Sequence, residues 1–121
     1  MKRDDDLIRD ILFKMEASEY SDYVVSLALG PSTEDEDDLE YYHLQLLSDA
    51  GFVLENINDR GVFRLTNQGH DYLNAIRDGK IWNKTKIAAK AVGGGTFDIL
   101  KEIATSYVKA ELKARIGLDL G

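Results

Sequence analysis

The chain contains two histidines, and histidine is the side chain most readily used for metal binding or proton transfer near neutral pH. His43 is expected on the apolar face of a helix, and His70 stands beside Asp71 in a capped turn. These two residues suggest either a metal pair or an acid–base couple. No HExxH pattern or comparable ligand spacing accompanies them, and a single histidine among leucines is usually a hydrogen-bonded core residue. We therefore predict a structural role for each.

The acidic run over residues 32–38 has a composition reminiscent of a calcium-binding loop. It lacks the central glycine and the distal glutamate of an EF-hand, so we interpret it as the solvated start of a helix. No serine or threonine stands in a nucleophile elbow, and the glycines at 93–95 are not followed by the Gly-Lys-Ser/Thr of a phosphate-binding loop. The sequence thus predicts a protein that is not an enzyme, with no catalytic residues, no metal ligands and no cofactor.

The composition fits one small domain. A chain of 121 residues, 44% of them hydrophobic, has enough apolar side chains for one core. The absence of cysteine excludes disulfides, cysteine-based zinc sites and thiol catalysis, and it suits a reducing cytoplasm. No apolar run has the length of a signal peptide or a membrane span. We expect a cytoplasmic protein with no membrane insertion.

The net charge of −7 is unevenly distributed. Residues 1–76 carry 17 acidic and 6 basic side chains, whereas residues 77–121 carry 5 acidic and 9 basic ones, which gives net charges of −11 and +4. A chain with two opposite halves can pair with itself, or it can offer its basic half to an acidic partner. The charges alone do not decide between these.

Periodicity in the first half predicts a helix, a strand, a second helix and a hairpin. Apolar residues recur at helical spacing over residues 4–19, and a β-type alternation over residues 23–29 ends at Gly30-Pro31. Thr33 and Glu36 fit a capping box, so a second helix is expected from there to a stop at Gly51. Its expected apolar face consists of Leu39, His43, Leu46, Leu47 and Ala50. Segments 52–57 and 62–65, joined by Asn58-Asp59-Arg60-Gly61, predict the hairpin.

The second half is predicted to be helical throughout. Thr66 is placed to cap a helix over residues 66–78, with Gly69 in its first turn where a side chain would collide with a neighbour. A further helix is expected up to Val92, and the glycines at 93–95 form a hinge. Thr96 then caps a long last helix that ends near residue 116.

This order predicts an α+β, mainly helical fold. We expect a winged-helix-like core of three short antiparallel strands plus helices in residues 1–78, and a C-terminal helical extension over residues 79–121, packed as part of the same domain. The string over residues 43–53 looks like the end of a recognition helix that runs into the wing of arsenic-repressor-type regulators. The string over residues 65–73 looks like the strand-to-helix joint of multiple-antibiotic-resistance-type regulators.

Short strings spread over nearly the whole chain match the pattern of one known family. They are Met1-Lys2-Arg3-Asp4, Leu7-Ile8-Arg9, Tyr42-His43-Leu44, Leu46-Leu47, Ala50-Gly51, Leu65-Thr66, Gly69-His70, Ala75-Ile76-Arg77, Trp82-Asn83-Lys84 and Phe97-Asp98-Ile99-Leu100-Lys101. Through these residues the chain resembles the bacterial and phage family called domain of unknown function family 2513. The similarity implies a small phage or prophage accessory protein and carries no known activity.

The helix at the position of a recognition helix has the wrong charge for DNA. Its start consists of Glu34, Asp35, Glu36, Asp37 and Asp38, with Glu40 just beyond. Carboxylates near the DNA backbone are repelled, and they offer no hydrogen-bond donors to guanine or phosphate oxygens. At about 1 kcal/mol per surface pair, such repulsions outweigh a few favourable base contacts. We therefore predict that this acidic helix binds a protein partner with a basic surface.

An alternative is a transcription regulator that binds nucleic acid through a different surface. The wing supplies Arg60 and Arg64, and the C-terminal region supplies the basic residues Lys80, Lys84, Lys86 and Lys90. Lysines near an aromatic side chain such as Trp82 can hold phosphates without reading bases. The same lysines equally suit a solvated helix face.

The last helix carries more apolar side chains than a single buried face needs. This surplus suggests contact with a second copy of the chain or with the core. The residues expected to form a homodimer contact are Phe97, Leu100, Tyr107 and Val108.

Overall fold

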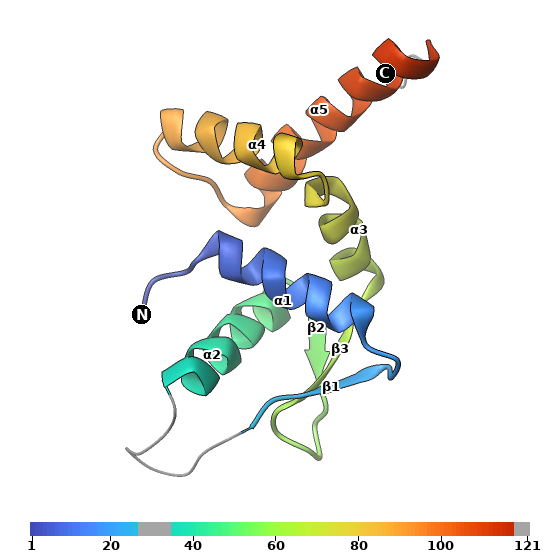
Figure 1. The fold of residues 1–121 in the computed structure, drawn as a ribbon. Coiled ribbons are helices and arrows are strands. Elements are labelled where there is room, and N and C mark those ends of the chain that lie inside the picture. Colours follow the sequence, from blue (N-terminus) through green and yellow to red (C-terminus); the bar gives the residue numbers. More distant parts are fainter. Residues whose placement is uncertain (27–34, 118–121) are drawn as a thin grey trace. The chain divides into compact units, whose positions relative to one another are not determined.

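The computed structural model describes residues 1–26 and 35–117, which fall into two compact units, 1–73 and 74–121 (Figure 1). The chain is α+β and mainly helical with three antiparallel strands, as predicted. Whether the two units pack as one domain stays a prediction. The first unit holds α1 (Asp5–Ala17), β1 (Asp22–Val24), α2 (Asp35–Asp49), β2 (Val53–Glu55), β3 (Val62–Leu65) and most of α3 (Asn67–Ile76), and the second holds the end of α3, α4 (Gly79–Ala91) and α5 (Phe97–Ile116).

Helix α1 forms because its start is capped and one of its faces is apolar. The Asp4 side chain accepts hydrogen bonds from the amides of Asp6 and Leu7 at 3.0 and 3.1 Å, which satisfies two amides that have no partner within the helix. The helix lies within the predicted range of residues 4–19, and its buried face consists of Ile8, Ile11, Leu12 and Met15.

The sheet has the order β1-β3-β2, with both pairs antiparallel. Phe63 on the central strand lies opposite Tyr23 and Glu55 in the register and is only 1% exposed. The predicted strand over 52–57 is too long, because β2 ends at Glu55. The Asn56 side chain accepts the amide of Asn58 at 2.9 Å and so begins the turn.

Helix α2 buries a face slightly different from the predicted one. His43, Leu44 and Leu47 are fully buried, whereas Ala50 is exposed at the end of the helix. The chain turns away at Gly51, which has a φ of +80° and supplies the expected left-handed stop. Thr33, the predicted cap, lies outside the described residues.

Thr66 and Gly69 join the hairpin to α3. The Thr66 hydroxyl donates to the Gly51 carbonyl at 2.6 Å and accepts the Gly69 amide at 3.1 Å. A Cβ at Gly69 would overlap the carbonyl oxygen of Phe52, which is the predicted reason for a glycine at this position. The Phe52 ring stacks on Tyr72 with centroids 4.7 Å apart, so the joint is part of the core.

The second unit is a helical hairpin with a cap at the start of each long helix. The Asp78 side chain accepts the Ile81 amide at 2.9 Å, and Thr96 accepts the Ile99 amide at 3.2 Å. Helices α4 and α5 pack against each other, and Ala89 and Leu100 are buried at the turn between them. Two glycines of the predicted hinge, Gly93 and Gly94, adopt positive φ in this turn.

Candidate interaction surface at the start of helix α2

The acidic run begins α2, and its described side chains face solvent to different degrees. Asp38 is exposed and Asp37 is half-buried. Within the described residues neither carboxylate has a hydrogen bond or an ion pair. Asp35 and Glu36 are described only as part of the helix, and Glu34 lies before the described segment.

Glu40, the last acidic residue of the predicted surface, is instead tied to two other elements. The Tyr23 hydroxyl of β1 donates to its Oε1 at 2.8 Å, and Lys14 of α1 places its Nζ 3.6 Å from Oε2. Burial, together with this hydrogen bond, raises the pKa of Tyr23. Glu40 therefore anchors the start of α2. The sequence carries no signal for this triad, because its members are far apart in the chain.

A second polar anchor fixes α2 against the hairpin. The Tyr41 hydroxyl donates to Glu55 Oε2 at 3.0 Å, and the Gly61 amide donates to the same oxygen at 2.8 Å. The Tyr41 ring also meets Phe63 edge-on at a centroid distance of 5.9 Å. One carboxylate thus links the helix to the turn between β2 and β3.

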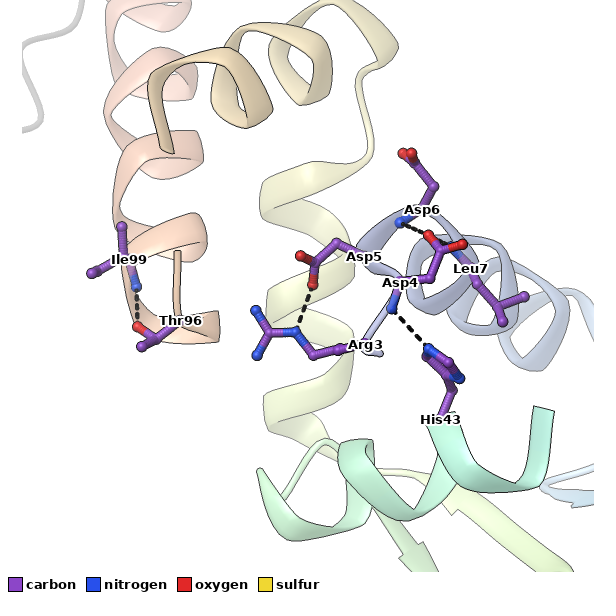
Figure 2. A network of polar contacts seen from close by, with 8 residues as sticks. All are labelled: Arg3, Asp4, Asp5, Asp6, Leu7, His43, Thr96 and Ile99. Atoms are coloured by element: carbon purple, nitrogen blue, oxygen red, sulfur yellow. Dashed lines mark hydrogen bonds and ion pairs between the residues drawn. The ribbon is translucent and has the colours of Figure 1, made fainter. Parts of the chain in front are cut away.

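His43 connects α2 to the start of α1 (Figure 2). The Asp4 amide donates to its Nε2 at 2.8 Å, and its Nδ1 lies 2.8 Å from the Leu39 carbonyl oxygen. Because a carbonyl only accepts and an amide N–H only donates, Nδ1 carries the ring hydrogen and Nε2 is the acceptor. The side chain is fully buried. The predicted structural role of His43 is confirmed, whereas His70 is exposed.

An ion pair lies at the start of α1. Arg3 Nε lies 3.0 Å from Asp5 Oδ1, as Figure 2 shows. Burial raises the pKa of Asp5, and the nearby guanidinium partly opposes this effect. Because the two side chains pair with each other within the first unit, the Asp5 carboxylate adds little to a surface for a partner.

The basic residues predicted as an alternative site divide between the two units. Arg60 is exposed in the hairpin turn. Arg64, also exposed, lies on β3 opposite Asp22 and Leu54 in the register. The four lysines belong to the second unit, so a surface shared by arginines and lysines stays a prediction.

The lysines of α4 form two pairs and not one row. At 100° per residue, Lys80 and Lys84 share one side of the helix, and Lys86 and Lys90 share another, about 120° away. Lys84 places its Nζ 5.7 Å from the centroid of the Tyr107 ring, and Lys86 lies 5.6 Å from that of Trp82. Each pair therefore contains one cation that lies over an aromatic ring.

The residues predicted for a homodimer contact differ in exposure. Leu100 is only 2% exposed, so it belongs to the core of its unit. Phe97, Tyr107 and Val108 are half-buried. Tyr107 lies under Lys84, and Val108 lines a shallow cleft with Ile81 of α4. A dimer contact through these residues stays a prediction.

Over residues 1–26 and 35–117, no group of three or more His, Asp or Glu side chains is arranged to hold a metal ion. In the same ranges, no helix has both the length and the apolar character needed to cross a bilayer.

The comparisons with known proteins establish the family. The family described as Hypothetical protein (DUF2513) matches residues 2–96, and the chain belongs to it, as the resemblance indicated. An uncharacterized protein of Haemophilus influenzae is 33% identical over 120 residues, which cover 93% of this chain and 99% of that protein. No solved structure matches the chain. The family match ends at Thr96, the residue that caps α5.

Proposed function

We propose that this chain is a protein–protein interaction module of winged-helix type, which docks the acidic start of α2 onto a basic surface of a partner protein. The observation that carries the proposal is the run of five carboxylate residues at 34–38, at the start of the helix that leads into the hairpin. The element order and the sheet order β1-β3-β2 support the winged-helix comparison, with α2 in the place of the recognition helix.

The anchoring of α2 supports docking by a fixed surface. Glu40 and Tyr41 hold the helix to α1, β1 and the hairpin, so a partner meets carboxylates on a helix whose position is already set. Such preorganisation lowers the entropic cost of binding. Charge complementarity would mainly speed association and exclude acidic competitors. The resemblance to a phage family and the absence of cysteine lead us to propose further a cytoplasmic, non-enzymatic accessory protein of a phage or prophage.

The test is a pull-down from a lysate of the host bacterium at rising salt. One variant neutralises Glu34, Asp35, Glu36, Asp37 and Asp38 by Asn or Gln. A matched control neutralises five exposed acidic residues elsewhere on the first unit, namely Asp10, Glu19, Asp49, Asp59 and Asp71. We expect the wild-type chain to capture a basic protein. High salt and the first variant should each abolish this capture, whereas the control variant should preserve it. Capture that is indifferent to salt and to the first variant refutes the proposal, as does an equal loss in the control.

A second candidate function is nucleic-acid binding through α4. The observation that favours it is the solvent exposure of Lys80, Lys84 and Lys90 on a helix of the basic unit. A gel-shift assay with genomic fragments at low salt tests it. Retardation at micromolar protein that is lost when these lysines become glutamates would favour regulation, and the absence of retardation would exclude it.

A further inference from the structure

Helix α5 has a stripe of apolar and small side chains that is only partly buried. Ile99, Ile103, Ser106 and Ala110 follow one another at spacings of four, three and four residues, so they line one side of the helix. Ile99 is 39% exposed, Ile103 is half-buried, and the two small residues are exposed.

The stripe lies on a different side from the contact with α4. Leu100 and Ala104 are buried, and Tyr107 carries Lys84 of α4 over its ring. At 100° per residue, the centre of this set is about 100° from the centre of the stripe. Both isoleucines therefore keep part of their side chains open to solvent on this 20-residue helix.

One flank of the stripe changes its charge along the helix. Asp98 and Glu102 occupy the flank in the first half of α5, and Lys109 and Lys113 occupy it in the second half. All four side chains are exposed, and none forms an ion pair with another residue of the described segments. The helix thus has an acidic end and a basic end along the same edge.

We infer that this face of α5 binds the same face of a second copy of the chain, with the two helices antiparallel around a two-fold axis near Thr105. This alignment places Ile103 against Ser106 of the second copy and Ile99 against its Ala110. A large side chain meets a small one at each layer, which allows close approach of the helices. Because the axis is two-fold, each contact occurs twice.

The same alignment pairs the charges. Glu102 lies opposite Lys109 of the second copy, and Asp98 lies opposite its Lys113. The antiparallel arrangement also sets the two helix dipoles in opposite directions. A parallel pair around a two-fold axis would instead turn this charged flank toward the other flank of the partner helix, the side with Leu100 and Tyr107, and would lose these charge pairs. The charge order therefore favours one direction of the partner helix.

This interface is not the one expected from the sequence. Leu100, Tyr107 and Val108 lie on the side of α5 that meets α4, whereas the stripe between Ile99 and Ala110 remains available. The inference is independent of the proposed docking surface on α2, because no substitution used to test it touches residues 34–38.

Sedimentation velocity on the full chain tests the inference. At low salt and about 100 µM protein, we expect a species of twice the 13.6 kDa chain mass. The variant D98K/E102K makes the flank wholly basic, and K109E/K113E makes it wholly acidic. Each variant alone is expected to associate at least about tenfold more weakly than the wild type. An equimolar mixture of the two restores a dimer, because every opposed pair is then of opposite charge.

Two controls make the outcome decisive. The variant K80E/K90E, which reverses two exposed charges on α4, should leave the dimer intact. Circular dichroism of each variant verifies its helical content. A wild-type chain that stays monomeric, a mixture that does not associate, or an equal loss of the dimer in K80E/K90E would each overturn the inference.

Discussion

The two units differ in what holds them together. In the first unit, polar bonds join residues far apart in sequence, including Asp4 with His43 and Tyr23 with Glu40. In the second, the hydrogen bonds of the caps, at Asp78 and Thr96, are local. Long-range bonds specify one tertiary arrangement, whereas local caps specify where helices begin. We therefore expect the first unit to be more sensitive to single buried substitutions.

The units also differ in charge. Because residues 74–76 carry no charge, the 17 acidic and 6 basic residues counted before residue 77 all belong to the first unit, and the 9 basic and 5 acidic ones belong to the second. The boundary between the compact units is therefore also the boundary between an acidic and a basic region. Each region therefore presents a surface whose net charge has one sign, negative in the first unit and positive in the second.

The largest expected difference in stability between the two units comes from a pair of glycine substitutions. Gly69→Ala should lower the free energy of unfolding by about 2–3 kcal/mol, because its Cβ would overlap the Phe52 carbonyl oxygen. Gly79→Ala, in the first turn of α4, has nothing within 4 Å of the new Cβ and should be neutral or slightly stabilising. Urea unfolding of both variants measures the difference. Equal effects would mean that the joint at Gly69 tolerates a side chain.

The two histidines provide a contrast within the first unit. His43→Leu should cost about 1–2 kcal/mol, because it leaves the Asp4 amide and the Leu39 carbonyl without this partner. His70→Leu replaces an exposed side chain and should change stability little. Thermal unfolding distinguishes the two. A neutral His43→Leu would show that water replaces both hydrogen bonds.

The cap of α4 should make the second unit sensitive to acid. The hydrogen bond from the Ile81 amide holds the pKa of Asp78 below its ordinary value of 3.8. A lowered pKa means that the carboxylate stabilises the fold above about pH 3.8 and that this stabilisation is lost as the pH falls through the folded value. Asp78→Asn retains an acceptor that does not titrate. The difference between the thermal midpoints of the two proteins should therefore shrink or reverse below pH 4, and a constant difference would contradict this.

The smallest effect is expected at the surface ion pair of the α2 anchor. Lys14→Ala should change stability by about 0.5 kcal/mol or less, because the ammonium is mostly exposed and 3.6 Å from Glu40. Tyr23→Phe removes the half-buried hydroxyl that donates to the same carboxylate and serves as the comparison. Calorimetry of both variants measures their order. A larger loss for Lys14→Ala would show that the ion pair, and not the hydroxyl, holds the helix.

The order of the elements could be predicted from the sequence because each helix and strand has a local signal. The Thr96 cap, the stop at Gly51 and the constraint at Gly69 are all properties of neighbouring residues. The strand predicted over 52–57 runs two residues too far at its C-terminal end, because the side chain of Asn56 begins the turn early. Strand propensity alone does not account for a hydrogen bond from a side chain to the main chain.

The anchors of the candidate surface could not be predicted, since they depend on tertiary contacts. Glu40 looks like one more member of the acidic run, yet its oxygens are engaged by Tyr23 and Lys14. The two lysine pairs on α4 likewise read as one basic patch in the sequence. Residue type predicts the charge of a surface, but only the fold decides which charges remain accessible.

The close approach at Gly69 also limits how this protein can diverge. A glycine packed against a backbone carbonyl has no neutral replacement, so compensating changes would have to move the main chain at Phe52 itself. In distant family members, we expect drift to concentrate in the hairpin turn around Arg60, while the joint keeps its glycine. Position 69 should therefore be a dependable landmark for aligning sequences that have otherwise lost their similarity.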